Sequence, residues 1–140
     1  MASPFVLFQP FLANLFNGQN APGADSLKLA LTNTLPSVGL ANFSQIAEIP
    51  PGGGYAVGGI PLVVLSSAQV GGVYTLVIQN FTLVATGAAI APWEWAVIYD
   101  FSKGTLIGYA DFGSTLSLDT SEVCNFQFDQ VNGLIQAASA

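Results

Sequence analysis

The stretch Trp93-Glu94-Trp95-Ala96-Val97-Ile98-Tyr99-Asp100 decides the fold. Large apolar side chains recur at every second position, which is typical of a β-strand. This spacing predicts that four of them share one face: Trp93, Trp95, Val97 and Tyr99. The turn-like segment Phe101-Ser102-Lys103-Gly104 then leads into a second apolar run, Thr105–Phe112, so the two runs are expected to form a hairpin.

Outward from this hairpin, the same two-residue period continues along most of the chain. Gly71-Gly72 separates two apolar runs by two residues, which indicates a second hairpin. The segment Tyr55–Leu65 can hold two short strands or one strand bent at Gly58-Gly59. The other runs with this period are Leu27–Thr32, Leu62–Ser66, Val73–Gln79, Phe81–Thr86 and Val123–Asp129. Short strands with Gly and Pro turns predict a mainly β chain, a single β-sandwich or jelly-roll-like domain.

One segment follows a helical period instead. In residues 4–18, Phe8, Phe11, Leu12 and Leu15 recur at helical spacing, and Asn17-Gly18 is a suitable helix end. The sequence therefore predicts a short N-terminal helix or arm over 1–18 and a β-sandwich over 19–140, within one structural domain. A further helical turn is expected near Asn42–Ala47.

The composition of the 140 residues excludes several kinds of chemistry. The chain has no histidine, no arginine, two lysines and one cysteine, Cys124. Zinc sites and histidine-based catalytic triads therefore cannot be assembled within one chain. Two lysines against eight carboxylates leave no basic patch for phosphates, so we expect no nucleic-acid binding.

The apolar character of the chain indicates assembly. Hydrophobic residues make up 51% of it and charged residues only 7%, whereas an average globular protein has about 25% charged residues. Such a small domain has too little polar surface to remain dispersed, so we expect other protein to cover part of it. Ile49–Trp93 carries no charge, but glycines and prolines interrupt it too often for a membrane span, and the N-terminus does not resemble a signal peptide.

Several short motifs suggest chemistry, but each is better explained as structure. Asp111-Phe112-Gly113 matches a kinase metal-binding triplet without the other kinase motifs, and Leu118-Asp119-Thr120-Ser121 only faintly resembles an aspartic-protease turn. The glycine-dense segment 52–59 lacks the Lys-Ser/Thr of a phosphate loop, so we expect bends there. Five carboxylates at strand ends and loops are expected to be solvated, although two could converge: Asp100, Asp111, Asp119, Glu122 and Asp129.

These observations predict no catalytic residue, no metal site and no cofactor. Trp93 and Trp95 could form a platform for a sugar ring, but we favour packing in the core or at a subunit interface. Apolar side chains surround the N-terminal helix on more than one face, so a single sheet cannot cover them all. The residues that we expect at an interface are Phe5, Phe8, Phe11, Phe16, Trp93 and Trp95.

The order of segments resembles a group of small structural proteins of tailed bacteriophages. An N-terminal helix ending in Asn-Gly precedes the lysine-containing run Leu27–Thr32 and then Ile46-Ala47-Glu48-Ile49. The series continues with Gly53-Gly54-Tyr55, the tryptophan strand 93–100 and Gly104–Gly113. The similarity spans about residues 8–136. The loop in this chain, with two prolines and three glycines, differs from the tighter form common in the group.

This resemblance implies a non-enzymatic virion protein made in the host cytoplasm. It favours a capsid decoration, or cement, protein on the outer surface of the head, which binds the major capsid protein and self-associates as a homotrimer. The alternatives are a tail, baseplate or fibre-attachment subunit, a lectin-like carbohydrate-binding module and, least favoured, a hydrolase.

Overall fold

The computed structural model describes residues 5–131 and 133–138, and it is mainly β. One α-helix, α1, spans Gln9–Phe16, and a 3-10 turn, η1, spans Phe43–Gln45. The strands are β1 (Phe5–Leu7), β2 (Leu27–Thr32), β3 (Ile60–Pro61), β4 (Val64–Val70), β5 (Val73–Ile78), β6 (Phe81–Val84), β7 (Ile90–Asp100), β8 (Thr105–Leu118), β9 (Val123–Phe126) and β10 (Ile135–Ala138).

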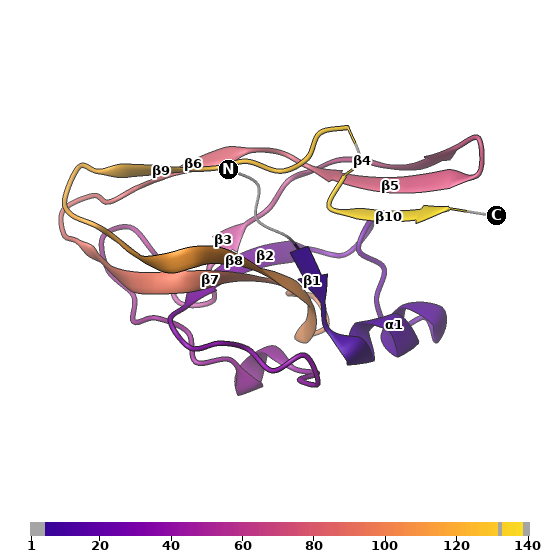
Figure 1. The fold of residues 1–140 in the computed structure, drawn as a ribbon, viewed down its shortest axis with the longest axis horizontal. Coiled ribbons are helices and arrows are strands. Elements are labelled where there is room, and N and C mark those ends of the chain that lie inside the picture. Colours follow the sequence, from indigo (N-terminus) through magenta and orange to yellow (C-terminus); the bar gives the residue numbers. More distant parts are fainter. Residues whose placement is uncertain (1–4, 132, 139–140) are drawn as a thin grey trace.

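The strands form two layers, as expected for a β-sandwich. One layer is a five-stranded antiparallel sheet with the order β1-β8-β7-β2-β3. The other layer contains a three-stranded sheet, β10-β5-β4, and a two-stranded sheet, β6-β9, which follow one another along the long axis of the molecule (Figure 1). The mainly β sandwich predicted from the sequence is confirmed.

Apolar side chains cover both faces of the five-stranded sheet. A first cluster lies between the layers and includes Leu29, Leu76, Ile78, Trp93 and Ile107. A second cluster lies on the opposite face, where Phe8, Val97 and Tyr99 pack against residues of the β2–β3 connection, such as Phe43. In Figure 1 this connection, with η1, runs beneath β7, β8 and β2. The sheet is therefore buried on both sides, which explains the near-continuous burial of β2 and of the end of β7.

The predicted hairpins are confirmed, and three of their strands, β4, β7 and β8, extend beyond the predicted runs, whereas β5 ends at Ile78. The β7–β8 hairpin turns at Phe101–Gly104, and β8 continues to Leu118. The β4–β5 hairpin turns at Gly71-Gly72, and both glycines have positive φ values, +60° and +84°. Two consecutive residues with positive φ match the twist of a two-residue hairpin, and glycine adopts them without steric cost.

The N-terminal segment differs from the single helix expected over 4–18. Phe5–Leu7 is a strand that pairs with Tyr109 and its neighbours in β8, and the helix begins only at Gln9. Phe8, between the two elements, and Phe11 in the helix are fully buried. Residues 5–16 are therefore part of the sandwich and not a separate arm, because β1 supplies the edge strand of the main sheet. Residues 1–4 of the predicted segment lie outside the described residues.

Candidate functional site

The structure separates the six expected interface residues into two groups. Phe8, Phe11 and Trp93 are buried in the clusters of the chain itself, so they are not available to a partner. Phe5 and Trp95 are partly buried against the same clusters. Phe16, at the end of α1, is 85% exposed. Of the six, Phe16 is therefore the residue that the structure presents to solvent, because α1 packs its other face against the sandwich.

The predicted common face of Trp93 and Trp95 is wrong. The pairing of β7 with β8 shifts register between Trp93 and Trp95, so the strict alternation of the strand is interrupted there. As a result, Trp93 enters the cluster between the layers, whereas Trp95 packs with Val97 and Tyr99 on the opposite face. The two indole rings do not form a platform, and the argument for sugar binding that depended on them is removed.

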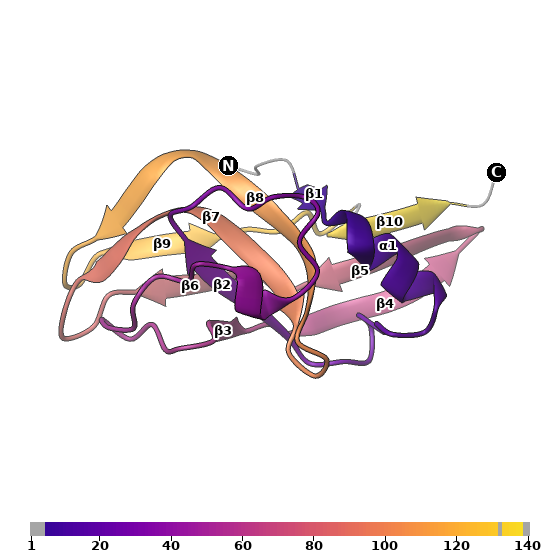
Figure 2. The same ribbon diagram turned by 90° about the horizontal axis from the view of Figure 1, so that it is seen from below.

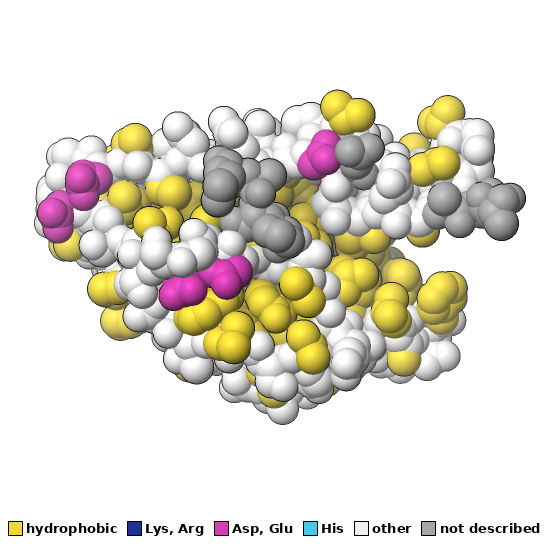
Figure 3. Space-filling view, viewed as in Figure 1, with side chains coloured by type: hydrophobic (Ala, Val, Ile, Leu, Met, Phe, Trp, Pro, Cys, Tyr) yellow, Lys and Arg dark blue, Asp and Glu magenta, His cyan; other side chains and the backbone are white. Residues whose placement is uncertain are grey.

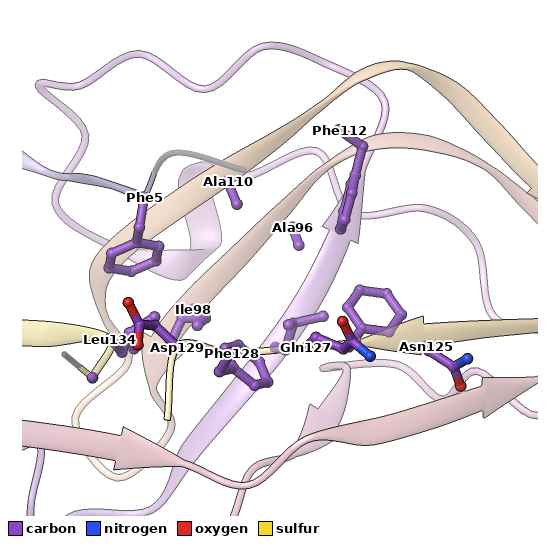
Figure 4. Close-up of a pocket in the computed structure, with 13 residues that line it drawn as sticks. Phe5, Ala96, Ile98, Ala110, Phe112, Asn125, Gln127, Phe128, Asp129 and Leu134 are labelled. Atoms are coloured by element: carbon purple, nitrogen blue, oxygen red, sulfur yellow. The ribbon is translucent and has the colours of Figure 1, made fainter. Parts of the chain in front are cut away.

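A cavity of about 250 Å³ opens between the two layers. Phe5 of β1 and Phe112 of β8 point from the main sheet toward the segment that follows β9 (Figure 4). Apolar side chains such as Ile98 and Leu134 line it together with the polar Asn125, Gln127 and Asp129. The lining contains no lysine and no cysteine, so the cavity offers apolar contact, hydrogen bonds and the carboxylate of Asp129.

Two of the carboxylates expected at the surface do converge with others. A side-chain hydrogen bond joins Asp25 and Asp100, and the amide of Asn20 donates to Asp100 at 2.9 Å. Asp100 is fully buried, which corrects the expectation that it is solvated. Burial, together with Asp25, raises the pKa of Asp100 to about 6, while the hydrogen bond to Asp100 lowers the pKa of Asp25. The pair therefore joins the α1–β2 loop to the β7–β8 turn.

A second convergence lies at the surface. Desolvation and the neighbouring Asp111 raise the pKa of the half-buried Glu94. Asp111 also accepts a hydrogen bond from the backbone N–H of Gly113 at 2.7 Å, so it belongs to a local irregularity within β8. Among residues 5–131 and 133–138, no group of three or more potential metal-ligating side chains is brought together.

The side chain of Glu48 fixes the glycine-dense segment 52–59, a role that no motif in the sequence indicates. Glu48 accepts hydrogen bonds from the hydroxyl of Tyr55 at 2.7 Å and from the backbone N–H of Gly58 at 2.9 Å. Tyr55 in turn accepts from the N–H of Leu31, and Tyr99 donates to the carbonyl of Gly58. A phosphate-binding loop would need free backbone N–H groups. The N–H of Gly58 is instead bonded to the carboxylate of Glu48.

The turn after β8 is also structural. The backbone N–H of Asp119 donates to the carboxylate of Glu122 at 2.7 Å, and the N–H of Glu122 donates to the carbonyl of Asp119. These bonds close a tight turn in which Ser121 has a positive φ of 77°. The turn that we expected at Leu118-Asp119-Thr120-Ser121 is confirmed.

An uncharged surface surrounds the β4–β5 hairpin, which we call the projecting hairpin (residues 64–78). It extends past the five-stranded sheet at the end of the molecule where α1 lies (Figures 1 and 2). Every side chain of β4 after Val64 is exposed, and Val70 at the tip is 79% exposed. Figure 3 shows hydrophobic side chains on the hairpin and on α1 at this end, and the acidic side chains visible in that view lie elsewhere.

Within the described part of the chain, no helix has the length and hydropathy required to cross a membrane. Three features could carry a function: the exposed apolar side chains, the pair Asp25–Asp100 and the cavity between the layers. No protein-family model, curated protein or solved structure matches this chain.

Proposed function

We propose that this protein is a capsid decoration protein, which binds the outer surface of a tailed-phage head and stabilises it through protein–protein contacts. The proposed partner is the major capsid protein, and the proposed location is the capsid surface. The observation that carries the proposal is the uncharged surface of the projecting hairpin and α1. Its exposed apolar side chains include Leu12, Phe16, Leu65 and Val70.

This surface suits adhesion because it combines exposed apolar groups with an absence of charge. An exposed apolar patch on a small protein marks an interaction site, since burying it removes unfavourable contact with water. Protein interfaces are depleted in charged side chains at their centres, and aromatic side chains such as Phe16 are enriched there. The resemblance to phage structural proteins, argued from the sequence, gives the partner that the surface alone does not name.

The proposal is tested with shells assembled from the major capsid protein of the genome that encodes this chain. We expect the purified protein to sediment with the shells in stoichiometric amounts, and electron microscopy to place it on their outer surface. Density on tails or baseplates would contradict the proposed location, and failure to bind any virion part would contradict the function.

A matched pair of substitutions tests the surface itself. Phe16→Ser is expected to weaken binding to shells at least about tenfold, because truncating an interface aromatic residue commonly costs more than about 1.4 kcal/mol. Val131→Ser is the control, since Val131 has the same exposed fraction, 85%, but lies outside α1 and the hairpin. Equal effects of the two substitutions would show that this surface is not the contact.

A further inference from the structure

We propose that the free edge of β4 pairs with β4 of a second copy of this chain, in antiparallel orientation, with Ala68 at the twofold axis. In the three-stranded sheet the order is β10-β5-β4, so one side of β4 has no neighbour among the described strands. This inference goes beyond the proposed function, because it concerns contact between copies and requires no capsid. It replaces the homotrimer that the resemblance implies with a twofold dimer.

The alternation of hydrogen bonds shows which backbone groups face this edge. Leu76 of β5 accepts a hydrogen bond from the N–H of Leu134 beside β10, so its backbone faces away from β4. Residues directly opposite one another in an antiparallel pair alternate between bonded and non-bonded pairs. Ser67, which lies opposite Leu76, and Gln69, two residues further on, therefore direct their N–H and C=O groups to the free edge.

These groups are complementary to the same strand in a second copy. With Ala68 facing Ala68 across the axis, Ser67 of each copy lies opposite Gln69 of the other. The two pairs can then exchange four backbone hydrogen bonds. The side chain of Ala68 is exposed and lies opposite Thr75, on the face away from the core, so it leaves room for the approach. A contact between identical patches is self-complementary, which is the requirement of a twofold dimer.

The charge distribution favours a second copy as the occupant. Each chain carries a formal net charge of −6, so two copies repel one another over most of their surfaces. No residue from Ile49 to Trp93 is charged, and the whole projecting hairpin lies in this range. The hairpin itself therefore adds no charge to the repulsion between two like-charged copies that meet at this edge.

The edge also lacks the features that normally prevent strand pairing. Natural edge strands are usually protected by lysines, prolines, bulges or inward-pointing charges. From Ser66 to Val70 the strand has no charged residue and no proline, and its single register shift lies before Ser66. Four consecutive pairs from Ser67 to Val70 then continue without a shift to the turn. An unprotected edge of this length is expected to be paired in the functional protein.

Charge substitutions at the axis test the proposal. By light scattering at about 50 μM, we expect the unmodified protein to be a dimer and the Ala68→Glu variant to be a monomer. An equimolar mixture of Ala68→Glu and Ala68→Lys should be a dimer again, because the two opposite charges then face one another across the axis. Thr82→Glu is the control, because Thr82 is exposed on β6 in the same layer and the added charge is the same. A monomeric or trimeric unmodified protein, or a dimer that persists in Ala68→Glu, would overturn the proposal.

A crosslink tests the register without depending on affinity. Opposite Cα atoms in a non-hydrogen-bonded pair lie about 4.5 Å apart, which is within the range that a disulfide spans. In a Cys124→Ser background, Ala68→Cys is therefore expected to form a covalent dimer on mild oxidation, and Thr82→Cys is not. Circular dichroism of each variant confirms that it is folded. A folded Ala68→Cys variant that crosslinks no faster than Thr82→Cys would exclude this register.

Discussion

At the scale of single residues, the buried Asp100 and its neighbour Asp25 predict an unusual dependence of stability on pH. The folded-state pKa of Asp100 is raised to about 6, whereas an unfolded aspartate titrates near about 3.9. Between these values the folded state holds a proton that the unfolded state has released, so the free energy of unfolding falls as pH rises. Asp25, with its lowered pKa, has the opposite effect, but that effect is lost only as pH falls below about 4.

We therefore expect the protein to melt at a higher temperature at pH 5 than at pH 7.5, by on the order of 5 °C. Asp100→Asn keeps a neutral group that can accept from Asn20, and it should reduce this difference by raising the melting temperature at pH 7.5. The half-buried Glu94 also has a raised pKa and acts in the same direction as Asp100, so Glu94→Gln is the control that separates the two contributions. An unchanged pH profile in Asp100→Asn would show that the pair does not hold the proton.

Gly59 provides a second prediction at this scale. Its φ is +93°, and a Cβ atom there would lie 2.2 Å from the carbonyl oxygen of Leu29 in β2. Gly59→Ala is expected to lower the free energy of unfolding by about 3 kcal/mol, because a positive φ and a backbone clash act together. Gly87 also has a positive φ, +77°, but open space around it, so Gly87→Ala should cost only about 1 kcal/mol. Chemical denaturation of both variants measures the difference, and equal losses would contradict the clash.

At the scale of elements, β1 and α1 behave as parts of the sandwich with one exposed face. Phe8 is fully buried beside Tyr109, with the ring centroids 5.4 Å apart, whereas Phe16 is exposed. Phe8→Ala is expected to lower the free energy of unfolding by about 3–5 kcal/mol, and Phe16→Ala to change it by less than about 0.5 kcal/mol. Denaturant melts of the two variants test this contrast. A small effect of Phe8→Ala would mean that the segment is a detachable arm.

At the scale of the whole molecule, an uncharged contact between strongly acidic copies predicts how salt affects self-association. Added salt screens the repulsion between net charges of −6 but weakens no ion pair at the β4 edge. The dimer dissociation constant is therefore expected to fall several-fold between about 0.05 M and 0.5 M sodium chloride, as measured by sedimentation equilibrium. Dissociation at high salt would indicate an ion-paired interface elsewhere on the molecule.

The sequence by itself determined the β class, both hairpins and the turns, because these depend on neighbours within a few residues. The alternation of Thr105–Phe112 and the Gly71-Gly72 pair predict their local structure without any distant contact. The composition excluded histidine-based catalytic triads and zinc sites within one chain, since the required residue types are absent from it.

Only the tertiary structure decided what depends on contacts between distant segments. Phe5–Leu7 is a strand because β8, about one hundred residues away, supplies its hydrogen-bond partners, although the local spacing favours a helix. Trp93 enters the core because the register of β7 against β8 shifts beside it, and one shifted residue turns a side chain to the opposite face. Asp100 has a raised pKa because the α1–β2 loop, with Asp25, packs beside the β7–β8 turn, a proximity that no sequence spacing encodes.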